Sequence, residues 1–285
     1  MNRPQNKVAI VTGGVAGIGE AISKKFAREG ASIVVAGLPD DPVDAVVAEI
    51  RESGGTAIGY SGDLSSFETA KGCVTVAMEE FGKLDVLINN AGVFVETNFL
   101  KEYSEEAFEY MFKNNNKATF MMSKAALPEL QKTKGNIVTA GSEAGILGIP
   151  QNAAYGGTKA FNTAFTKGLA AEQAANGVRC NVVAPGPIDT AWTYDETGPM
   201  DKKMEKLNLQ ATLMGRRGTA EEVANVYLFL ASDEATYVTG AVYTVDGGIT
   251  IAKGPTGKEA DSLFKEEPES NLGLEHTHEG HTSIR

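Results

Sequence analysis

The chain has 285 residues, of which 42% are hydrophobic and 22% are charged, and its formal net charge is −11. That length suffices for one α/β domain with a large core, and the composition is ordinary for a soluble globular protein. The acidic balance argues against a general nucleic-acid binder, which would present a basic face. No apolar run reaches the roughly 18 residues that a membrane-spanning helix needs.

The N-terminal residues enter an apolar segment almost at once, so we expect no signal peptide. Cys73 and Cys180 fall in segments that read as a helix and a buried strand. Free thiols in a reducing compartment fit that placement. We therefore expect a cytoplasmic protein.

Short apolar, β-branched runs alternate with helix-length segments along the whole chain. The expected strands are Val8–Val11, Ser32–Ala36, Thr56–Tyr60, Asp85–Asn89, Asn136–Ala140, Arg179–Val183 and Ala241–Val245. The expected helices are Ile18–Glu29, Val43–Glu52, Phe67–Phe81, Glu105–Leu130, Asn152–Ala175 and Glu221–Ala231. Nearly all-apolar strands between helices predict a parallel sheet that is covered on both faces. The predicted fold class is α/β, a single doubly wound domain of about seven strands.

Two of the expected helices begin with the pattern of a capping box. Ser65 and Glu68 form it before one helix, and Thr219 and Glu222 form it before the last. Gly72 and Gly168 lie inside expected helices, where glycine is unfavourable. The sequence gives no reason for either glycine.

Two segments interrupt the alternation. Residues 187–218 form a long insertion that contains the only tryptophan, Trp192, and a weak helical pattern over Asp201–Leu213. A long insertion after a strand of such a sheet predicts a lid over a substrate site. Residues 253–285 are polar and contain glycine and proline, so we expect an irregular C-terminal extension after a domain that spans residues 1–252.

A glycine-rich stretch, Thr12–Gly19, follows the first strand and opens the first helix. Glycines at such a junction permit a tight turn and let the backbone approach a pyrophosphate at the helix N-terminus. The spacing is GxxxGxG, one residue longer than the common dinucleotide fingerprint. The place between strand and helix favours a phosphate-binding turn over a plain tight turn.

Tyr155 and Lys159 are four residues apart in an expected helix, so their side chains share one face. A tyrosine exchanges protons near neutral pH only if its pKa falls well below the ordinary value of about 10. A neighbouring cation has that effect because it favours the phenolate. The pair therefore suggests an acid–base centre, although the same spacing arises by chance in many helices.

Four motifs together identify a family. The Thr12–Gly19 turn, the Asn89–Gly92 run (NNAG), the Tyr155–Lys159 pair and the Pro185–Gly186 turn resemble those of the short-chain dehydrogenase/reductase family. The resemblance covers about residues 7–249. It implies a Rossmann-fold dehydrogenase domain, a nicotinamide cofactor, and hydride transfer between a hydroxyl carbon and a carbonyl.

The resemblance also implies a catalytic set of Asn115, Ser142, Tyr155 and Lys159. Ser142 would hydrogen-bond the substrate oxygen, and Tyr155 would accept or donate the proton. Lys159 would lower the pKa of Tyr155 and hold the ribose of the cofactor. Asn115 would support a proton path through water; because Asn114 and Asn116 flank it, an offset of one residue stays open.

Other positions match residues that bind the cofactor in the family. Asp63 would bond the adenine ring. The carboxamide of the nicotinamide would be held by Pro185, Gly186, Ile188 and Thr190. The full expected set is Gly13, Gly17, Ile18, Gly19, Asp63, Leu64, Asn90, Ala91, Gly92, Tyr155, Lys159, Pro185, Gly186, Ile188 and Thr190.

The end of the second expected strand departs from both common cofactor patterns. NAD enzymes usually carry an acidic residue there, which bonds the ribose 2′-hydroxyl, but this chain has Gly37. NADP enzymes usually place a cation next in sequence or within the glycine turn, but this chain has Leu38 and Ala16. An unpaired 2′-phosphate near Asp40 and Asp41 would be costly. We therefore expect NAD, with NADP as the alternative.

The leading interpretation is an NAD(P)-dependent alcohol dehydrogenase or carbonyl reductase. One alternative is a 3-oxoacyl-carrier-protein reductase using NADP, which would call for a basic surface. Enoyl reductases of this fold space their tyrosine and lysine by seven, which argues against that activity. A dinucleotide sensor without catalysis is a further alternative, but the four catalytic residues are all present.

The remaining expectations concern the substrate, the metal content and the assembly. The histidines of the chain, His276, His278 and His281, all lie in the C-terminal extension, so we expect no metal site and no histidine base. Gly247–Ala252 resembles the segment by which subunits of the family contact one another, which implies a homotetramer. The resemblance also implies a small alcohol or ketone as the substrate. Expected substrate contacts are Phe94, Glu143, Trp192, Tyr194, Met200 and Met204.

Overall fold

Seven parallel strands form one sheet in the order β3-β2-β1-β4-β5-β6-β7. The computed structural model describes residues 5–193, 198–199 and 202–251. The strands are β1 (Val8–Thr12), β2 (Ser32–Gly37), β3 (Thr56–Ser61), β4 (Val86–Asn89), β5 (Asn136–Ala140), β6 (Arg179–Pro185) and β7 (Val242–Val245). All six pairings are parallel, so the predicted α/β fold class is confirmed.

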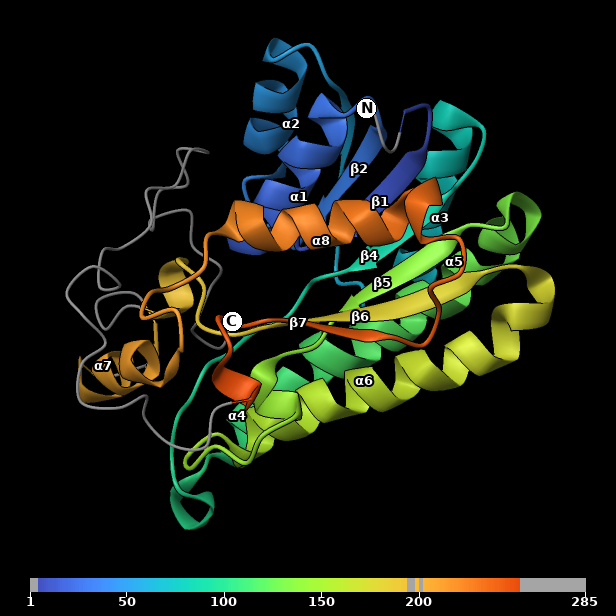
Figure 1. Cartoon of the computed structure of the whole chain (residues 1–285). Coiled ribbons are helices and arrows are strands. Elements are labelled where there is room, and N and C mark those ends of the chain that lie inside the picture. The colour runs from blue at the N-terminus through green and yellow to red at the C-terminus, as the bar shows by residue number, and fades with distance from the viewer. Residues whose placement is uncertain (1–4, 194–197, 200–201, 252–285) are drawn as a thin grey trace.

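Helices cover both faces of the sheet (Figure 1). They are α1 (Gly17–Arg28), α2 (Val43–Glu52), α3 (Phe67–Phe81), α4 (Glu105–Phe112), α5 (Ala118–Thr133), α6 (Ala153–Gln173), α7 (Lys202–Ala211) and α8 (Ala220–Ala231). The core is divided accordingly: Ala9 and Val11 of β1 pack with α1, α2 and α8, whereas Val8 and Ile10 pack with α3, α5 and α6. Alternate residues thus point to opposite, equally apolar layers, which explains why the strand is apolar throughout.

The strand order reverses between β1 and β4. From β1 the chain proceeds outward through β2 and β3, and it then returns to add β4, β5, β6 and β7 on the other side. In open parallel sheets, ligands bind outside the carboxyl ends of the strands at such a reversal. The loops after β1 and β4 therefore mark where a site is expected.

One helix prediction was confirmed with an added feature, and one cap prediction was wrong. The helix expected over Glu105–Leu130 runs without interruption through α4, a π-helical turn at Lys113–Lys117 and α5. The N-cap of α3 is Ser66 rather than Ser65, and its side chain makes no capping bond. Asp63 explains this difference, because its Oδ1 accepts a hydrogen bond from the Ser65 backbone at 3.0 Å and closes a turn.

The capping box that begins α8 is confirmed. The Thr219 hydroxyl accepts a hydrogen bond from the Glu222 backbone at 3.0 Å, and the Glu222 carboxylate accepts one from the Thr219 backbone at 2.7 Å. Two bonds from Arg216 hold the same carboxylate, and they lower the pKa of Glu222 to about 2.

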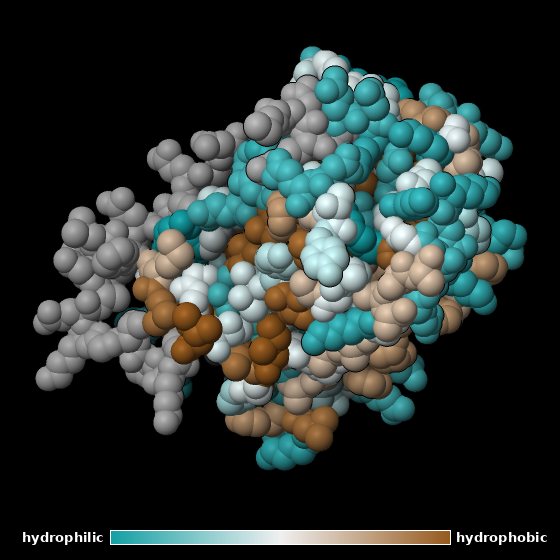
Figure 2. Space-filling model, turned by 45° about the vertical axis from the view of Figure 1, so that its right-hand side comes forward, coloured by the Kyte–Doolittle hydropathy of each residue, from teal (hydrophilic) through white to brown (hydrophobic). Residues whose placement is uncertain are grey.

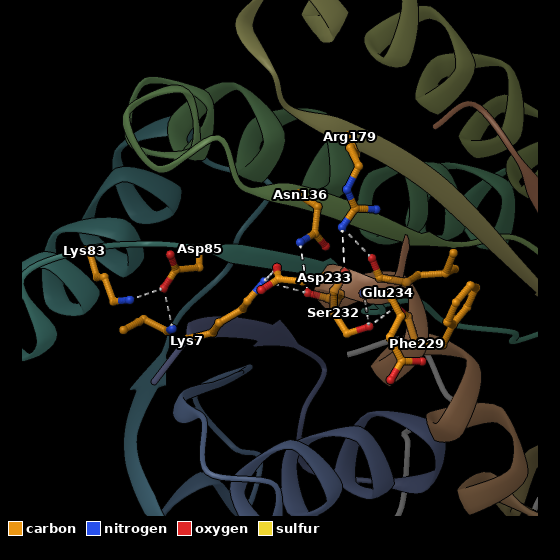
Figure 3. A network of polar contacts seen from close by, with 12 residues as sticks. Lys7, Lys83, Asp85, Asn136, Arg179, Phe229, Ser232, Asp233 and Glu234 are labelled. Carbon is orange, nitrogen blue, oxygen red and sulfur yellow. Dashed lines mark hydrogen bonds and ion pairs between the residues drawn. The ribbon is translucent and has the colours of Figure 1, made fainter. Parts of the chain in front are cut away.

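A polar network ties the strands together near their amino ends, at the end of the sheet opposite to the carboxyl ends (Figure 3). Asp85 accepts a hydrogen bond from the Val8 backbone at 2.8 Å and pairs with Lys83 at 2.9 Å. Arg179 donates to the backbone of Leu230 at 2.9 Å, and Lys7 pairs with Asp233. Because these bonds join β1, β6 and the end of α8, they belong to the framework of the fold.

The segment 187–218 is tied at its base by a bridge between Ile188 and Gly218. It contains the short helix Ala191–Thr193 and α7. Helix α7 lies within the weak helical pattern expected over Asp201–Leu213 and confirms it. Its function as a lid stays a prediction. The extension 253–285, with its three histidines, lies outside the described residues.

Candidate active site

One cavity runs along the carboxyl ends of the strands, from the glycine turn after β1 to the segment after β6. It is lined by every residue of the expected cofactor set, and also by Ser142, Glu143, Phe94 and Trp192. Asn115 is the only member of the expected catalytic set that does not line it. The fold thus gathers side chains from six separate loops into one place.

The glycine turn is shaped for close approach. Gly13 has a φ of +59°, and a Cβ there would lie 2.9 Å from the Ala91 Cα. A Cβ on Gly19 would lie 1.9 Å from the Gly13 carbonyl oxygen. Only glycine fits at either position, and the exposed backbone faces the cavity at the start of α1. This cradle fits the pyrophosphate of a dinucleotide.

The Thr12 side chain joins this turn to the loop after β4. Its hydroxyl accepts hydrogen bonds from the backbones of Asn90 and Ala91, both at 3.0 Å. The Asn90 amide donates to the carbonyls of Thr12 and Gly13, each at 3.2 Å. These bonds hold the two loops at the strand reversal in a fixed relation.

Ser142, Tyr155 and Lys159 meet in one part of the cavity. Ser142 follows β5, and its hydroxyl lies close enough to that of Tyr155 to lower the pKa of the tyrosine. Tyr155 lies in the first turn of α6, and the Lys159 ammonium, one turn later, is 5.6 Å from its ring centroid. Lys159 is almost completely buried. The four-residue spacing therefore places phenol and ammonium on one face, as predicted.

The pKa values of this pair differ from the expectation. Burial raises the pKa of Tyr155 above its ordinary value, and the negative charge of Glu143 adds to this, while the Ser142 hydrogen bond lowers it. Burial lowers the pKa of Lys159 to about 8. In the protein alone, desolvation outweighs the ammonium, so Tyr155 holds its proton firmly.

Asn115 lies behind the cavity wall in the π-helical turn. Its Oδ1 accepts a hydrogen bond from the Val93 backbone at 2.6 Å, and its amide donates to the Val93 carbonyl at 3.0 Å. A Cβ on Gly92 would lie 3.1 Å from this Oδ1 and 3.3 Å from the Lys159 ammonium. Asn115 is thus close to Lys159, whereas Asn116 bonds Asn162 instead.

The opposite end of the cavity carries two carboxylates. Burial opposes ionisation of Asp63, but hydrogen bonds from Lys113 and Ser65 outweigh it and keep its pKa below the ordinary value. Asp41, beside the end of β2, accepts a hydrogen bond from the Leu38 backbone at 2.7 Å and lines the cavity. No sequence motif marked Asp41 as a site residue, because it lies four positions after the usual selector.

Aromatic rings border the substrate side. The Phe94 ring centroid is 4.6 Å from that of Tyr155 and 6.5 Å from that of Trp192. Tyr194 and Met200 lie outside the described residues, as does the side chain of Met204. Asn152 also lines the cavity and was missed, because an asparagine before a helix reads from sequence as part of the helix start.

Comparisons with known proteins agree with this geometry. A family model described as Enoyl-(Acyl carrier protein) reductase matches residues 14–250. The 2,5-dichloro-2,5-cyclohexadiene-1,4-diol dehydrogenase LinX of Sphingobium indicum is 38% identical over 251 residues, covering 88% of this chain and 98% of that protein. The chain belongs to the short-chain dehydrogenase/reductase family.

Two further members of the family show the same extent of similarity. The 3-oxoacyl-[acyl-carrier-protein] reductase FabG of Thermotoga maritima is 35% identical over 250 residues, covering 87% of this chain and 100% of that protein. The crystal structure of gox2181 has a TM-score of 0.84 and 32% identity, covering 88% of this chain and 98% of that one.

As a member of this short-chain dehydrogenase/reductase family, the protein is an oxidoreductase that transfers a hydride between a hydroxyl or carbonyl carbon and a nicotinamide cofactor. The glycine cradle and the long cavity fit such a cofactor. Within the described ranges, no helix has both the length and the apolar composition needed to cross a membrane.

Proposed function

We propose that the protein interconverts a secondary alcohol and its ketone, with Tyr155 as the general acid and base. The observation that carries this is the pair of neighbouring hydroxyls from Ser142 and Tyr155, next to buried Lys159 in one cavity that fits a dinucleotide. A substrate oxygen bound between the two hydroxyls would receive two hydrogen bonds. The nicotinamide, when bound, accepts the hydride in oxidation and supplies it in reduction.

Tyr155, Ser142 and Lys159 have different roles in the proton transfer. In reduction, Tyr155 donates its proton to the carbonyl oxygen, and Ser142 stabilises the charge that develops on that oxygen. In oxidation, the alcohol proton moves to the Tyr155 oxygen. The charged form of Lys159 favours the phenolate. Because burial lowers the pKa of Lys159 to about 8, this stabilisation is lost as the pH rises through about 8.

Asn115 acts in this proposal as a positioning residue. Its side chain accepts from the N–H of Val93 and donates to the carbonyl of Val93 and to the Thr158 hydroxyl, so it is engaged within the protein. By holding that strand extension next to Lys159, it supports the path by which the proton leaves the site. A π-helical turn at a functional site is a common way to aim such a side chain.

The experiment that tests the catalytic proposal replaces Tyr155 by phenylalanine. We expect kcat to fall at least about a hundredfold, because proton transfer by a positioned side chain contributes on that order. Binding of the cofactor, followed by its fluorescence, should persist, which separates lost chemistry from lost folding. Turnover by Tyr155→Phe at the wild-type rate would refute the mechanism.

We further infer that NAD(H) is the preferred cofactor. Asp41 supports this, because its carboxylate lies at the end of β2 in the cavity, where the family usually holds the adenosine ribose. A 2′-phosphate near this carboxylate would suffer repulsion.

The alternative activity is 3-oxoacyl-carrier-protein reduction with NADP. The Thermotoga maritima relative carries that name, which is the observation in its favour. The net charge of −11 argues against it, since an acidic carrier protein would be repelled. The family description names an enoyl reductase, but the spacing of Tyr155 and Lys159 favours the alcohol and ketone chemistry.

We also propose a cytoplasmic homotetramer. Support comes from a continuous row of partly exposed phenylalanine rings on α4, α5 and α6, with neighbouring centroids 5.8–6.2 Å apart. Figure 2 shows apolar side chains, in tan and brown, gathered over the lower half of one face. An exposed apolar face of this kind usually marks a protein contact.

A further inference from the structure

Three residues that line the cavity each carry one buried polar atom without a hydrogen-bond partner among the described residues: Glu143 (Oε2), Asn152 (Oδ1) and Tyr227 (the hydroxyl). Tyr227 of α8 belongs to the apolar core, whereas the two atoms of interest, Oε2 of Glu143 and Oδ1 of Asn152, come from residues close in sequence to Ser142 and Tyr155. Glu143 and Asn152 are each only 8% exposed. Leaving a buried acceptor unsatisfied costs about 1–3 kcal/mol, so two in one cavity need an explanation.

Their placement shows that neither atom serves the fold. Asn152 is the N-cap residue of α6, yet its side chain makes no capping bond, which is the usual role of asparagine there. Glu143 begins a short 3-10 turn whose bonds to Ile146 and Leu147 come from its backbone, not from its carboxyl. Both side chains are therefore held in the cavity wall without a structural task.

The two atoms flank the catalytic pair along the chain. Glu143 directly follows Ser142, and Asn152 precedes Tyr155 by three residues, at the start of the same helix. A substrate whose reacting oxygen lies between Ser142 and Tyr155 would therefore bring its neighbouring atoms towards Glu143 and Asn152. The rings of Phe94 and Trp192 would cover its hydrocarbon part.

We propose that Glu143 and Asn152 form a specificity site for a second hydroxyl group, so that the substrate is a diol, a polyol or the matching hydroxyketone. This inference rests on the proposed function. A second hydroxyl would donate a hydrogen bond to the acceptors that otherwise have none. A site built to bond a hydroxyl discriminates strongly against an analogue that lacks it, because its buried groups are then left unpaired.

The charge state of Glu143 favours a hydroxyl over an ammonium group. Burial and, secondly, the nearby charge of Asp246 raise the pKa of Glu143 to about 8. Tyr155 is the other ionisable group coupled to it. At neutral pH the carboxyl is therefore largely protonated and can both accept and donate a hydrogen bond. A neutral acid gives an amino alcohol little advantage.

The test compares matched substrates on the intact protein. Cyclohexane-1,2-diol would be assayed against cyclohexanol, and butane-2,3-diol against butan-2-ol, with NAD and with NADP. We expect kcat/KM for the diol to exceed that of its mono-alcohol by at least about tenfold in one pair, the value of one good hydrogen bond. In Glu143→Leu and Asn152→Leu, this ratio should fall towards one.

The controls keep the result specific. Glu143→Gln retains a neutral donor and acceptor and should preserve most of the ratio, and Glu172→Leu, on the exposed face of α6, should not change it. If the wild type has the same kcat/KM for the mono-alcohols as for the diols, this inference is overturned and the proposed function stays intact. A preference for 2-aminocyclohexanol over the diol would also overturn it. Turnover of none of these substrates or their ketones would contradict the proposed function itself.

Discussion

Asp41 illustrates how a carboxylate can reach a cavity from a position that the usual sequence pattern does not mark. The end of β2 carries Gly37, where a Cβ would lie 3.0 Å from the Asp41 Oδ2. An acidic side chain at position 37 would therefore collide with the carboxylate that already lies there. The glycine and the aspartate are two halves of one arrangement, in which the acid reaches the cavity from the following loop.

Replacing Asp41 by asparagine tests this at the residue scale. Asparagine keeps an oxygen for the Leu38 backbone but removes the negative charge. We expect the wild type to bind NADH at least about tenfold more tightly than NADPH, equal to about 1.4 kcal/mol, and Asp41→Asn to narrow that gap. Fluorescence titration with both cofactors measures it, and Asp44→Asn, on α2, is the control. A wild type that binds NADPH more tightly would contradict the assignment.

Two glycines within helices differ in whether packing against a neighbouring element requires them. Gly72 of α3 faces β3, and a Cβ there would lie 2.5 Å from the Tyr60 hydroxyl. That hydroxyl donates to the Thr69 carbonyl at 2.8 Å, so it has no freedom to retreat. Gly168 of α6 is exposed, and nothing lies within 4 Å of its ideal Cβ. The first glycine has a packing reason, and the second has none in the described structure.

The two glycines predict opposite effects of the same substitution. Gly168→Ala should raise the free energy of unfolding by about 0.5–1 kcal/mol, because alanine favours a helix. Gly72→Ala should lower it by about 1 kcal/mol or more, because the methyl group overpacks against Tyr60. Denaturant unfolding measures both. In a Tyr60→Phe background, Gly72→Ala should lose its penalty; an unchanged penalty there would show that Tyr60 is not its cause.

At the scale of the whole molecule, the strand reversal decides where the chemistry lies. Residues from the loops after β1, β4, β5 and β6 are far apart in sequence but line one cavity. The polar network at the other end of the strands leaves that side structural (Figure 3). The phenylalanine row lies on α4, α5 and α6, so a contact there would leave the glycine turn before α1 uncovered.

A charge placed in the phenylalanine row should weaken assembly. We expect the wild type to have four times the chain mass in solution, and Phe161→Glu to yield smaller species, because a carboxylate would be buried in the contact. Light scattering after gel filtration measures the mass. Tyr237→Glu is the control, since Tyr237 is fully exposed and outside the row. A wild type that is monomeric at micromolar concentration would contradict the proposal.

The sequence by itself determined the elements and the cofactor turn. Strand runs and glycine spacing depend on local physics, so β5 and α3 were predicted to the residue. The spacing of Tyr155 and Lys159 likewise follows from the helix repeat. The π-helical turn at Lys113–Lys117 was not predicted, because no local sequence signal marks it; in the structure, Asn115 of this turn accepts a hydrogen bond from the backbone of Val93, 22 residues earlier in the chain.

Only the tertiary structure decided the electrostatics of the site and which of its buried polar atoms have a hydrogen-bond partner. Sequence spacing suggested that Lys159 controls the pKa of Tyr155, but burial outweighs it, and burial is a property of the packed chain. Asn152 reads as a helix start and Glu143 as an ordinary pocket residue. Their unpartnered oxygens become evident only when every neighbour is in place, because hydrogen-bond satisfaction depends on groups that the chain brings together from distant positions.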